Sequence, residues 1–308
     1  MVLAAVFAGA LTAMQSYMNG KLGLALGNGV IAAWITFAGA LVILTLVVAF
    51  SGKSRQGFWR VISAVRGGEL KWWTLFGGLA GAFFVVTQSA TVALIGVALF
   101  TLGVVAGQVT SSVFFDWLGI TPSGKILPTL PRIIGSVLAI VSVLVAVWSE
   151  LFSGGETVLI IFAVASGLVI SWQTAANGFV AQESRSAVVA TAINFIGGFI
   201  ALTIVGLLIV LFEGMPTNWP ANPLLYLGGL LGLVFIALAA VIVRTIGVLI
   251  LAMATIAGQL FASVLLDTFA PLAAATITPG VFVGTALAFI AVLVAGWREF
   301  THREPYQK

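Results

Sequence analysis

The stretch from Ala106 to Asp116 reads AGQVTSSVFFD, and the stretch from Ala257 to Asp267 reads AGQLFASVLLD. The second copy lies 151 residues after the first, and six of the eleven positions are identical. Both copies place Gln, Ser and Asp at intervals of four residues: Gln108, Ser112 and Asp116, then Gln259, Ser263 and Asp267. This spacing puts the three side chains of each copy on one face of a helix. A match of this length at one offset indicates a duplicated unit.

The composition predicts a protein that lies in a membrane. The chain has 308 residues, of which 61% are hydrophobic and 7% charged, and its mean hydropathy is +1.21. A soluble domain has about 25% charged residues. Apolar runs of about 18 residues or more recur along the chain, which is typical of membrane-spanning helices. Because the runs are continuous rather than alternating, they favour helices over a β-barrel.

Several classes of function are disfavoured by the same composition. The absence of cysteine excludes disulfides and thiolate metal sites. In a membrane protein the net charge of +4 reports topology more often than nucleic-acid binding. The sequence contains no HExxH or Walker motif, and its single histidine, His302, cannot serve a membrane-embedded triad. We therefore expect no enzyme activity, metal, cofactor or nucleic-acid partner.

The hydrophobic runs predict ten membrane spans and therefore an all-α polytopic fold. The spans are residues 2–20, 29–50, 72–91, 97–115, 132–149, 157–177, 187–211, 224–243, 247–266 and 280–297. The first run lacks the charged region of a signal peptide, so we expect it to be retained as a helix. With loops on alternating sides, twelve basic residues share the side of the N-terminus: Lys53, Arg55, Arg60, Arg66, Lys71, Lys125, Arg132, Arg185, Arg244, Arg298, Arg303 and Lys308. Lys21 alone lies on the other side, so the positive-inside rule predicts that both termini are cytoplasmic.

The duplication extends to other spans. Gln15-x-x-x-Asn19-Gly20 returns as Gln173-x-x-x-Asn177-Gly178, Thr36-Phe37-Ala38-Gly39 as Asn194-Phe195-Ile196-Gly197, and Gly77-Gly78-x-x-Gly81 as Gly228-Gly229-x-x-Gly232. These matches predict two five-helix units, residues 1–150 and 151–308. Because five is odd, the second unit must enter the membrane inverted. Inverted repeats occur in many secondary transporters, whose substrate sites lie near the midplane between the halves.

Polar side chains inside the spans are the candidate site residues. Gln108 and Gln259 fall near the middle of their spans, and Gln15 and Asn19 toward the outer side, where Gln173 and Asn177 mirror them on the inner side. We expect these six amides to bind substrate. Four further residues are expected to join the same cavity: Gln88, Asn194, Trp34 and Trp172.

The alternative interpretation is structural. Buried Gln and Asn also clamp helices together, at about 0.6 kcal/mol per hydrogen bond, and Trp is a common interfacial anchor. The symmetric arrangement of the six amides favours a site. No titratable residue falls in the middle of a span, which favours a neutral or zwitterionic solute over coupling through a buried carboxylate. We expect Asp116 and Asp267 to be solvated helix-end residues, with a role in gating or coupling as the alternative.

Three motifs stand out in the chain: QxxxNGKLG from Gln15 to Gly23, GGLxGAFFV from Gly77 to Val85, and AGQ-x3-S-x3-D. Together they resemble the YdcZ-like family of the drug/metabolite transporter superfamily. That family has short five-helix members and fused pairs, and this chain is similar to a fused pair. Its second half departs from the pattern, because Gly-Phe-Val follows Asn177 in place of Gly-Lys-Leu.

The resemblance implies a bacterial inner-membrane carrier of small organic molecules that works by alternating access, with spans 5 and 10 at the periphery. A related lineage, the small multidrug resistance proteins, has a glutamate where Gln15 stands here, so proton-for-cation antiport is not implied. One fused chain supplies both halves, so a monomer suffices, and a homodimer is also compatible with the sequence.

The sequence therefore predicts a secondary-active or facilitative transporter of a small polar, neutral or zwitterionic metabolite. Two alternatives stay open. An exporter of lipophilic or aromatic compounds would depend on Trp34, Trp172 and the many Phe residues. A non-transporting membrane scaffold would need no water-filled cavity.

Overall fold

The computed structural model describes residues 1–122, 124–148, 155–272 and 278–296. These residues form helices, turns and connections, and none of them forms a strand. Three expectations fall outside the described residues: the boundary between residues 150 and 151, the last residue of the spans predicted to end at 149 and 297, and the tail that contains His302.

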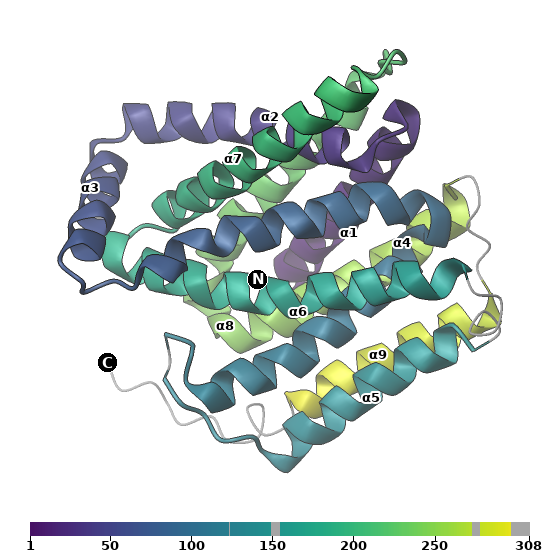
Figure 1. Cartoon of the computed structure of the whole chain (residues 1–308). Helices are drawn as coiled ribbons and strands as arrows, with labels where there is room; N and C mark the ends of the chain where they lie inside the picture. Colours follow the sequence, from purple (N-terminus) through teal and green to yellow (C-terminus); the bar gives the residue numbers. More distant parts are fainter. Residues whose placement is uncertain (123, 149–154, 273–277, 297–308) are drawn as a thin grey trace.

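The described residues form α-helices and two 3-10 helices, which pack as a bundle (Figure 1). In chain order they are α1 (Val2–Leu26), α2 (Gly29–Phe50), α3 (Gly52–Arg66), η1 (Trp72–Phe76), α4 (Gly77–Leu118), α5 (Leu130–Ala146), α6 (Gly155–Ser184), α7 (Ala187–Glu213), η2 (Pro223–Leu227), α8 (Gly228–Phe269) and α9 (Pro279–Ala295).

Helix α4 is two segments that turn back on each other at Gly96 (Figure 1). Gly96 has φ 84° and ψ 163°, a conformation that glycine adopts readily and other residues do not. Residues 77–95 and 97–118 therefore correspond to the spans predicted at 72–91 and 97–115. The two spans are joined by a single residue instead of a loop.

The lengths and composition of the helices fit a polytopic membrane protein, as predicted. Six stretches are long and apolar enough to cross a bilayer: Gly29–Phe50, Trp72–Leu118, Thr157–Ser184, Ala187–Glu213, Pro223–Val243 and Ile250–Phe269. Helices α5 and α9 are also apolar but have 17 residues each, which is the short end of the range of about 17–25 residues for a spanning helix. Helix α1 has 25 residues and is not among the six. The number of ten crossings stays a prediction.

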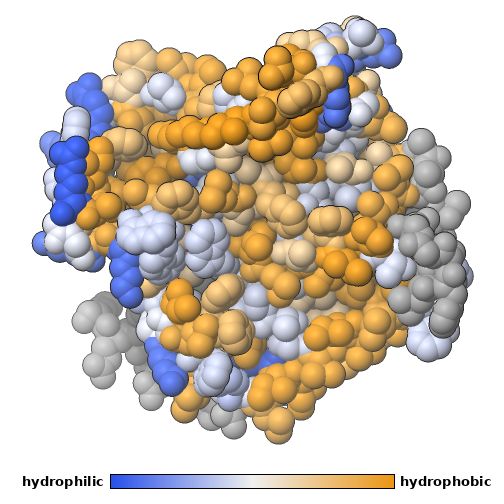
Figure 2. All heavy atoms as spheres, in the orientation of Figure 1, coloured by the Kyte–Doolittle hydropathy of each residue, from blue (hydrophilic) through white to orange (hydrophobic). Residues whose placement is uncertain are grey.

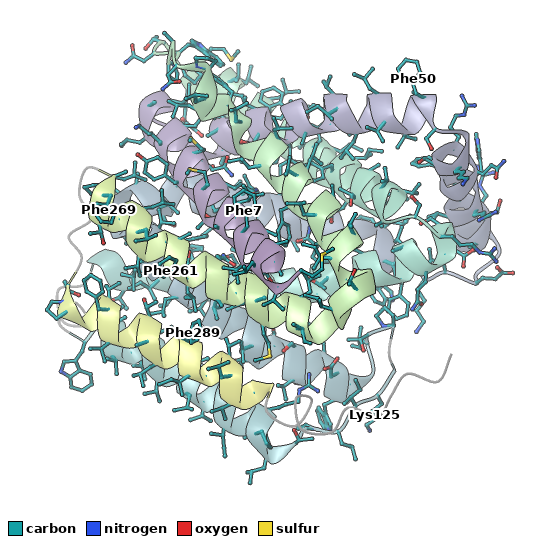
Figure 3. All side chains as sticks on the ribbon, turned by 180° about the vertical axis from the view of Figure 1, so that it is seen from behind. Phe7, Phe50, Lys125, Phe261, Phe269 and Phe289 are labelled. Atoms are coloured by element: carbon teal, nitrogen blue, oxygen red, sulfur yellow. The ribbon has the colours of Figure 1, made fainter. Side chains whose placement is uncertain are left out.

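On the face shown in Figure 2, hydrophobic side chains cover most of the surface, and hydrophilic ones gather toward its edges, notably over α3. On the opposite face, Phe7, Phe261 and Phe289 point outward from α1, α8 and α9 (Figure 3). Their exposed fractions are 59%, 65% and 41%. An apolar belt of this extent suits contact with lipid and would be a liability in water.

Several helix crossings are close, and two of them involve equivalent positions of the sequence repeat. A Cβ atom at Gly9 of α1 would lie 1.9 Å from the carbonyl oxygen of Thr255 in α8. A Cβ atom at Gly167 of α6 would lie 2.1 Å from the carbonyl oxygen of Val104 in α4. Only glycine permits such an approach of two backbones. Helices α5 and α9 pack side by side at the edge of the bundle, as the resemblance implies (Figure 1).

Candidate amide and carboxylate sites

The first cluster of amides is fully buried, and each of its amides is hydrogen-bonded to neighbouring side chains. The Asn19 Nδ2 donates to Gln88 Oε1 at 2.9 Å, and the Gln88 Nε2 donates to Ser16 Oγ at 2.6 Å. The Asn19 Oδ1 accepts from Thr36 Oγ1 at 3.0 Å. Asn19, Gln88 and Ser16 are each 0% exposed. A closed network of this kind joins α1, α2 and α4 and leaves little capacity to bind a solute in this conformation.

The second cluster lies on α6 and α7 and is more open. The Gln173 Nε2 donates to Asn194 Oδ1 at 2.9 Å. Asn194 is 5% exposed, whereas Gln173 and Asn177 are only partly buried. Asn177 has no side-chain hydrogen bond among the described residues, so its amide is available to a ligand.

Glycines at the start of α4 and α8 face these amides in matching positions. Cβ atoms at Gly77 and Gly81 would lie 3.0 Å from Asn177 Oδ1 and 2.7 Å from Gln173 Nε2. In the other half of the chain, a Cβ atom at Gly228 would lie 2.0 Å from Asn19 Oδ1, and one at Gly232 would lie 3.1 Å from Gln15 Oε1. The repeated Gly-Gly-x-x-Gly motif therefore contacts the repeated Gln-x-x-x-Asn motif of the other half. Gln15 is partly buried, and its amide has no hydrogen bond among the described residues.

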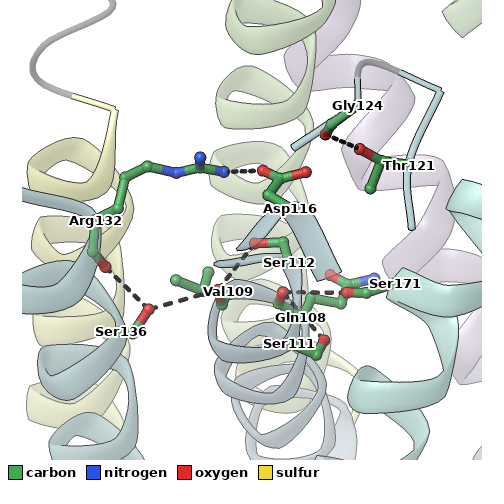
Figure 4. Close-up of polar contacts among 10 residues, drawn as sticks. All are labelled: Gln108, Val109, Ser111, Ser112, Asp116, Thr121, Gly124, Arg132, Ser136 and Ser171. Carbon is green, nitrogen blue, oxygen red and sulfur yellow. Dashed lines mark hydrogen bonds and ion pairs between the residues drawn. The ribbon is translucent and has the colours of Figure 1, made fainter. Parts of the chain in front are cut away.

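Gln108 and Gln259 lie at the two close helix crossings. Their backbone nitrogens are 3.0 Å and 2.9 Å from the Cβ positions of Gly167 and Gly9. The Gln108 carbonyl accepts from Ser171 Oγ of α6 at 3.1 Å (Figure 4). Gln108 is partly buried and Gln259 is 7% exposed. Neither amide has a hydrogen bond among the described residues, so both remain available to a ligand.

The two predicted tryptophans pack against protein. The Trp34 Nε1 donates to Thr203 Oγ1 at 3.0 Å and its ring covers Gly206, so Trp34 ties α2 to α7. Trp172 stacks on Trp73, with ring centroids 6.4 Å apart and planes at 27°. Trp34 therefore lies apart from the amides, in the contact between α2 and α7.

Asp267 is not the solvated residue that its place at a span end predicts. It is 5% exposed. Its Oδ1 accepts from the backbone N–H of Val97 at 2.9 Å, and its Oδ2 from that of Ala98 at 2.7 Å. The turn at Gly96 leaves these two N–H groups without partners inside their own helix. Asp267 therefore caps the second segment of α4 and ties the end of α8 to it.

Asp116, the equivalent residue in the first half, has different partners. It forms an ion pair with Arg132 of α5, and the two side chains are 16% and 17% exposed (Figure 4). Ser136, one turn further along α5, donates to the carbonyl of Arg132 at 2.9 Å and lies 3.5 Å from that of Val109 (Figure 4). Equivalent carboxylates thus serve a helix cap at one position and an ion pair at the other.

The expected amides do not gather in one chamber. The structure brings Asn19 to Gln88, and Gln173 to Asn194 beside Asn177. The two clusters face α4 at Gln88 and at Gly81, seven residues apart, or about 10 Å at 1.5 Å per residue. Two open hollows among the described residues, of about 350 and 360 Å³, are lined by apolar residues and threonine only. Among the described residues, no three His, Cys, Asp or Glu side chains could hold a metal ion.

Sequence reasoning missed the hydroxyl partners of the amides and the cap at Gly96. Thr36 was visible only as the counterpart of Asn194, and Ser16 carried no signal beyond its place beside Gln15. The cap had a usable signal: Gly96 and Gly247 are equivalent in the repeat, as are Asp116 and Asp267.

The family described as "Putative inner membrane exporter, YdcZ" matches the chain twice, over residues 1–145 and 158–294. A crystal structure described only as "Crystal structure of protein" is similar over 98% of this chain and 97% of its own, with a TM-score of 0.55 and 20% sequence identity. No curated protein sequence matches the chain. At that identity the solved structure shows a shared fold and nothing more. The family match covers both halves of the chain, which therefore belongs to the YdcZ family of multi-pass inner-membrane transporters and is not an enzyme.

Proposed function

We propose that this transporter moves a small polar, neutral or zwitterionic metabolite by alternating access between two inverted five-helix halves. Both termini are cytoplasmic in this proposal, because the basic residues of α3 and of the connection after α4 belong to the side of the N-terminus. Amides both donate and accept hydrogen bonds, so a passage along which they lie suits a solute with both kinds of group.

The observation that carries the proposal is a set of reciprocal contacts between equivalent residues. A two-fold axis requires that if residue i contacts the equivalent of j, then j contacts the equivalent of i. Gly9 contacts Thr255, and Gly167 contacts Val104. Gly9 and Gly167 are equivalent at an offset of 158 residues, and Val104 and Thr255 at an offset of 151. Phe37 and Phe195, also equivalent at 158, contact each other with ring centroids 4.8 Å apart. These pairs support two halves related by a pseudo-two-fold axis between α2 and α7.

The proposed site consists of five amides that keep hydrogen-bonding capacity for a solute, called the open amides, although Gln259 is 7% exposed in this conformation. They are Gln15, Gln108, Gln173, Asn177 and Gln259. Asn19, Gln88 and Trp34 instead hold helices together, and Asn194 positions Gln173. Open amides come from both halves, as a site between inverted repeats requires.

In the proposed mechanism Asp267 and Asp116 each form a contact that stabilises one of the two conformations. In this conformation Asp267 bonds to the start of the second segment of α4, while Asp116 bonds to Arg132. The halves exchange roles when an inverted-repeat transporter changes state. We therefore expect the opposite state to release Asp267 and to bring Asp116 to the backbone that follows Gly247, the equivalent of Gly96.

Water accessibility tests this proposal without knowledge of the substrate. The chain has no cysteine, so single variants Gln15→Cys, Gln108→Cys and Gln259→Cys can be labelled in membrane vesicles with a membrane-impermeant thiol reagent. We expect labelling at all three positions and none in Phe37→Cys, which is 2% exposed. If the three amide positions do not react while the exposed control Gln182→Cys does, the amides line no passage. That result would favour the interpretation as a non-transporting scaffold.

A second candidate, export of lipophilic compounds, is favoured by one groove. It lies between α4, α5 and α6, has a volume of about 360 Å³ and includes Thr110, Ile140 and Leu168 in its lining. The family description names an exporter, which agrees with this candidate. Ile140→Trp would fill the groove without touching the amides. A loss of transport in that variant, with Gln108→Leu unaffected, would favour lipophilic export.

A further inference from the structure

Helix α3 runs across one end of the bundle, at a steep angle to the long helices (Figure 1). It follows α2 directly, and Ser51 caps its first turn by accepting from the Ser54 N–H at 3.2 Å. One face of α3 is buried, formed by Ser54, Gly57, Val61 and Ala64. The helix is therefore amphipathic and docked onto the rest of the protein.

The buried face of α3 packs on the turn between α6 and α7. A Cβ atom at Gly57 would lie 2.7 Å from the carbonyl oxygen of Ser184 and 3.3 Å from Val189 Cγ2. Val61 and Ala64 share one apolar cluster with Val189. The turn itself is tight, because Arg185 has a φ of 55°. A helix of the first half thus braces the turn that joins two helices of the second.

The other face of α3 is basic and exposed. It carries Lys53, Arg55, Arg60 and Arg66, all of them exposed. None of the four forms an ion pair among the described residues, where the Arg132–Asp116 pair is the one found. Glu69 is the only acidic residue between positions 51 and 71. In Figure 2 the hydrophilic residues of α3 form a blue edge of the molecule.

Exposed aromatic residues lie beside the basic ones. Phe50, Trp59 and Trp72 are 88%, 65% and 68% exposed. Tryptophan is enriched at the depth of lipid headgroups, where one side of the ring meets hydrocarbon and the other meets water. A basic amphipathic helix with exposed tryptophan lies in the plane of a membrane interface and attracts anionic lipid.

We propose that the exposed face of α3 binds the phosphate groups of anionic phospholipids and thereby braces the α6–α7 turn. Arginine and lysine pair with phosphate oxygens through charge-assisted hydrogen bonds. Helices α6 and α7 carry the second amide cluster, Gln173, Asn177 and Asn194, so bound lipid stabilises the pair of helices that holds this cluster. The inference requires the membrane location of the chain and does not depend on the proposed substrate.

The test compares melting midpoints of the detergent-purified full chain with and without added lipid. The variant K53Q/R55Q/R60Q/R66Q removes the basic face, and K21Q/K125Q removes two other exposed cations. We expect phosphatidylglycerol to raise the midpoint of the wild type and of K21Q/K125Q by about 5 °C, and that of the quadruple variant by less than about 1 °C. Without lipid, the quadruple variant is expected to have the same melting midpoint as the wild type, because the replaced side chains are exposed.

Three outcomes would overturn the proposal. Phosphatidylglycerol could stabilise the quadruple variant as much as the wild type, which would place lipid binding elsewhere. Phosphatidylcholine could match phosphatidylglycerol on the wild type, which would remove the role of charge. Glycerol phosphate in solution could match the lipid, which would assign the face to a soluble anion. None of these results depends on transport, so the proposed function stands or falls separately.

Discussion

The substitution Asp267→Asn is expected to weaken the contact between α8 and the second segment of α4. The Asp267 carboxylate accepts two backbone hydrogen bonds, at 2.9 Å from Val97 and 2.7 Å from Ala98, in a position that is 5% exposed. A hydrogen bond to a charged group contributes about 1.5–3 kcal/mol. Asparagine keeps one acceptor oxygen and turns an NH₂ group toward the second N–H, so one bond is lost. The expected cost is about 2 kcal/mol of folding free energy.

The assay is a melting curve of the purified protein. In a chain of this size, about 2 kcal/mol lowers the midpoint by about 4 °C. Asp116→Asn is the matched control, because it changes the equivalent residue of the other half. The ion pair of Asp116 with Arg132 is partly exposed. The melting midpoint of Asp116→Asn is therefore expected to fall by no more than about 2 °C.

Two results would refute the reasoning about the cap. One is an Asp267→Asn protein that melts within about 1 °C of the wild type. The other is a loss in Asp116→Asn as large as that in Asp267→Asn. Either result would mean that the two hydrogen bonds contribute little to folding stability. The role proposed for Asp267 in stabilising this conformation would then be wrong as well.

Three further predictions follow from other contacts. Gln88→Leu leaves the buried Asn19 amide short of a partner and is expected to cost about 2 kcal/mol, seen as a fall of about 4 °C in the melting midpoint; an unchanged midpoint would contradict the clamp. Gly167→Leu drives a side chain into the backbone of α4 and is expected to abolish the monodisperse peak in size-exclusion chromatography, whereas Gly39→Leu, which has open space, is expected to retain it. Trp34→Phe removes the hydrogen bond to Thr203 and is expected to cost about 1 kcal/mol, and a variant more stable than the wild type would contradict that role.

The helices could be predicted from sequence because their signals are long. Apolar runs mark the spans, and Asn28 and Ser186 accept from backbone N–H groups at the starts of α2 and α7, as capping residues do. The connection at Gly96 shows the limit of this signal. The stretch Val92–Gly96 is apolar, and Gly96 is the only residue in it that is typical of turns. The chain reverses there because Gly96 adopts a positive φ.

The amides could be named from sequence, but their roles could not. Asn19 and Gln88 are 69 residues apart in the chain, and nothing local reveals that each satisfies the other. Asp267 was misjudged because a residue at a span end normally meets water. Here the tight turn beside it leaves two backbone N–H groups in need of an acceptor, and the carboxylate is buried to supply it.

The central claim is that polar solute binds among the open amides, and ligand-dependent melting tests it most directly. The wild type, Gln108→Leu and the exposed control Gln182→Leu would be melted with amino acids, nucleosides, polyamines, quaternary amines and lipophilic aromatic cations. A ligand that binds the folded state raises the midpoint by mass action. We predict that one class of neutral or zwitterionic polar compound stabilises the wild type and Gln182→Leu but not Gln108→Leu. Stabilisation by the lipophilic cations alone, or equal stabilisation of Gln108→Leu, would contradict the account.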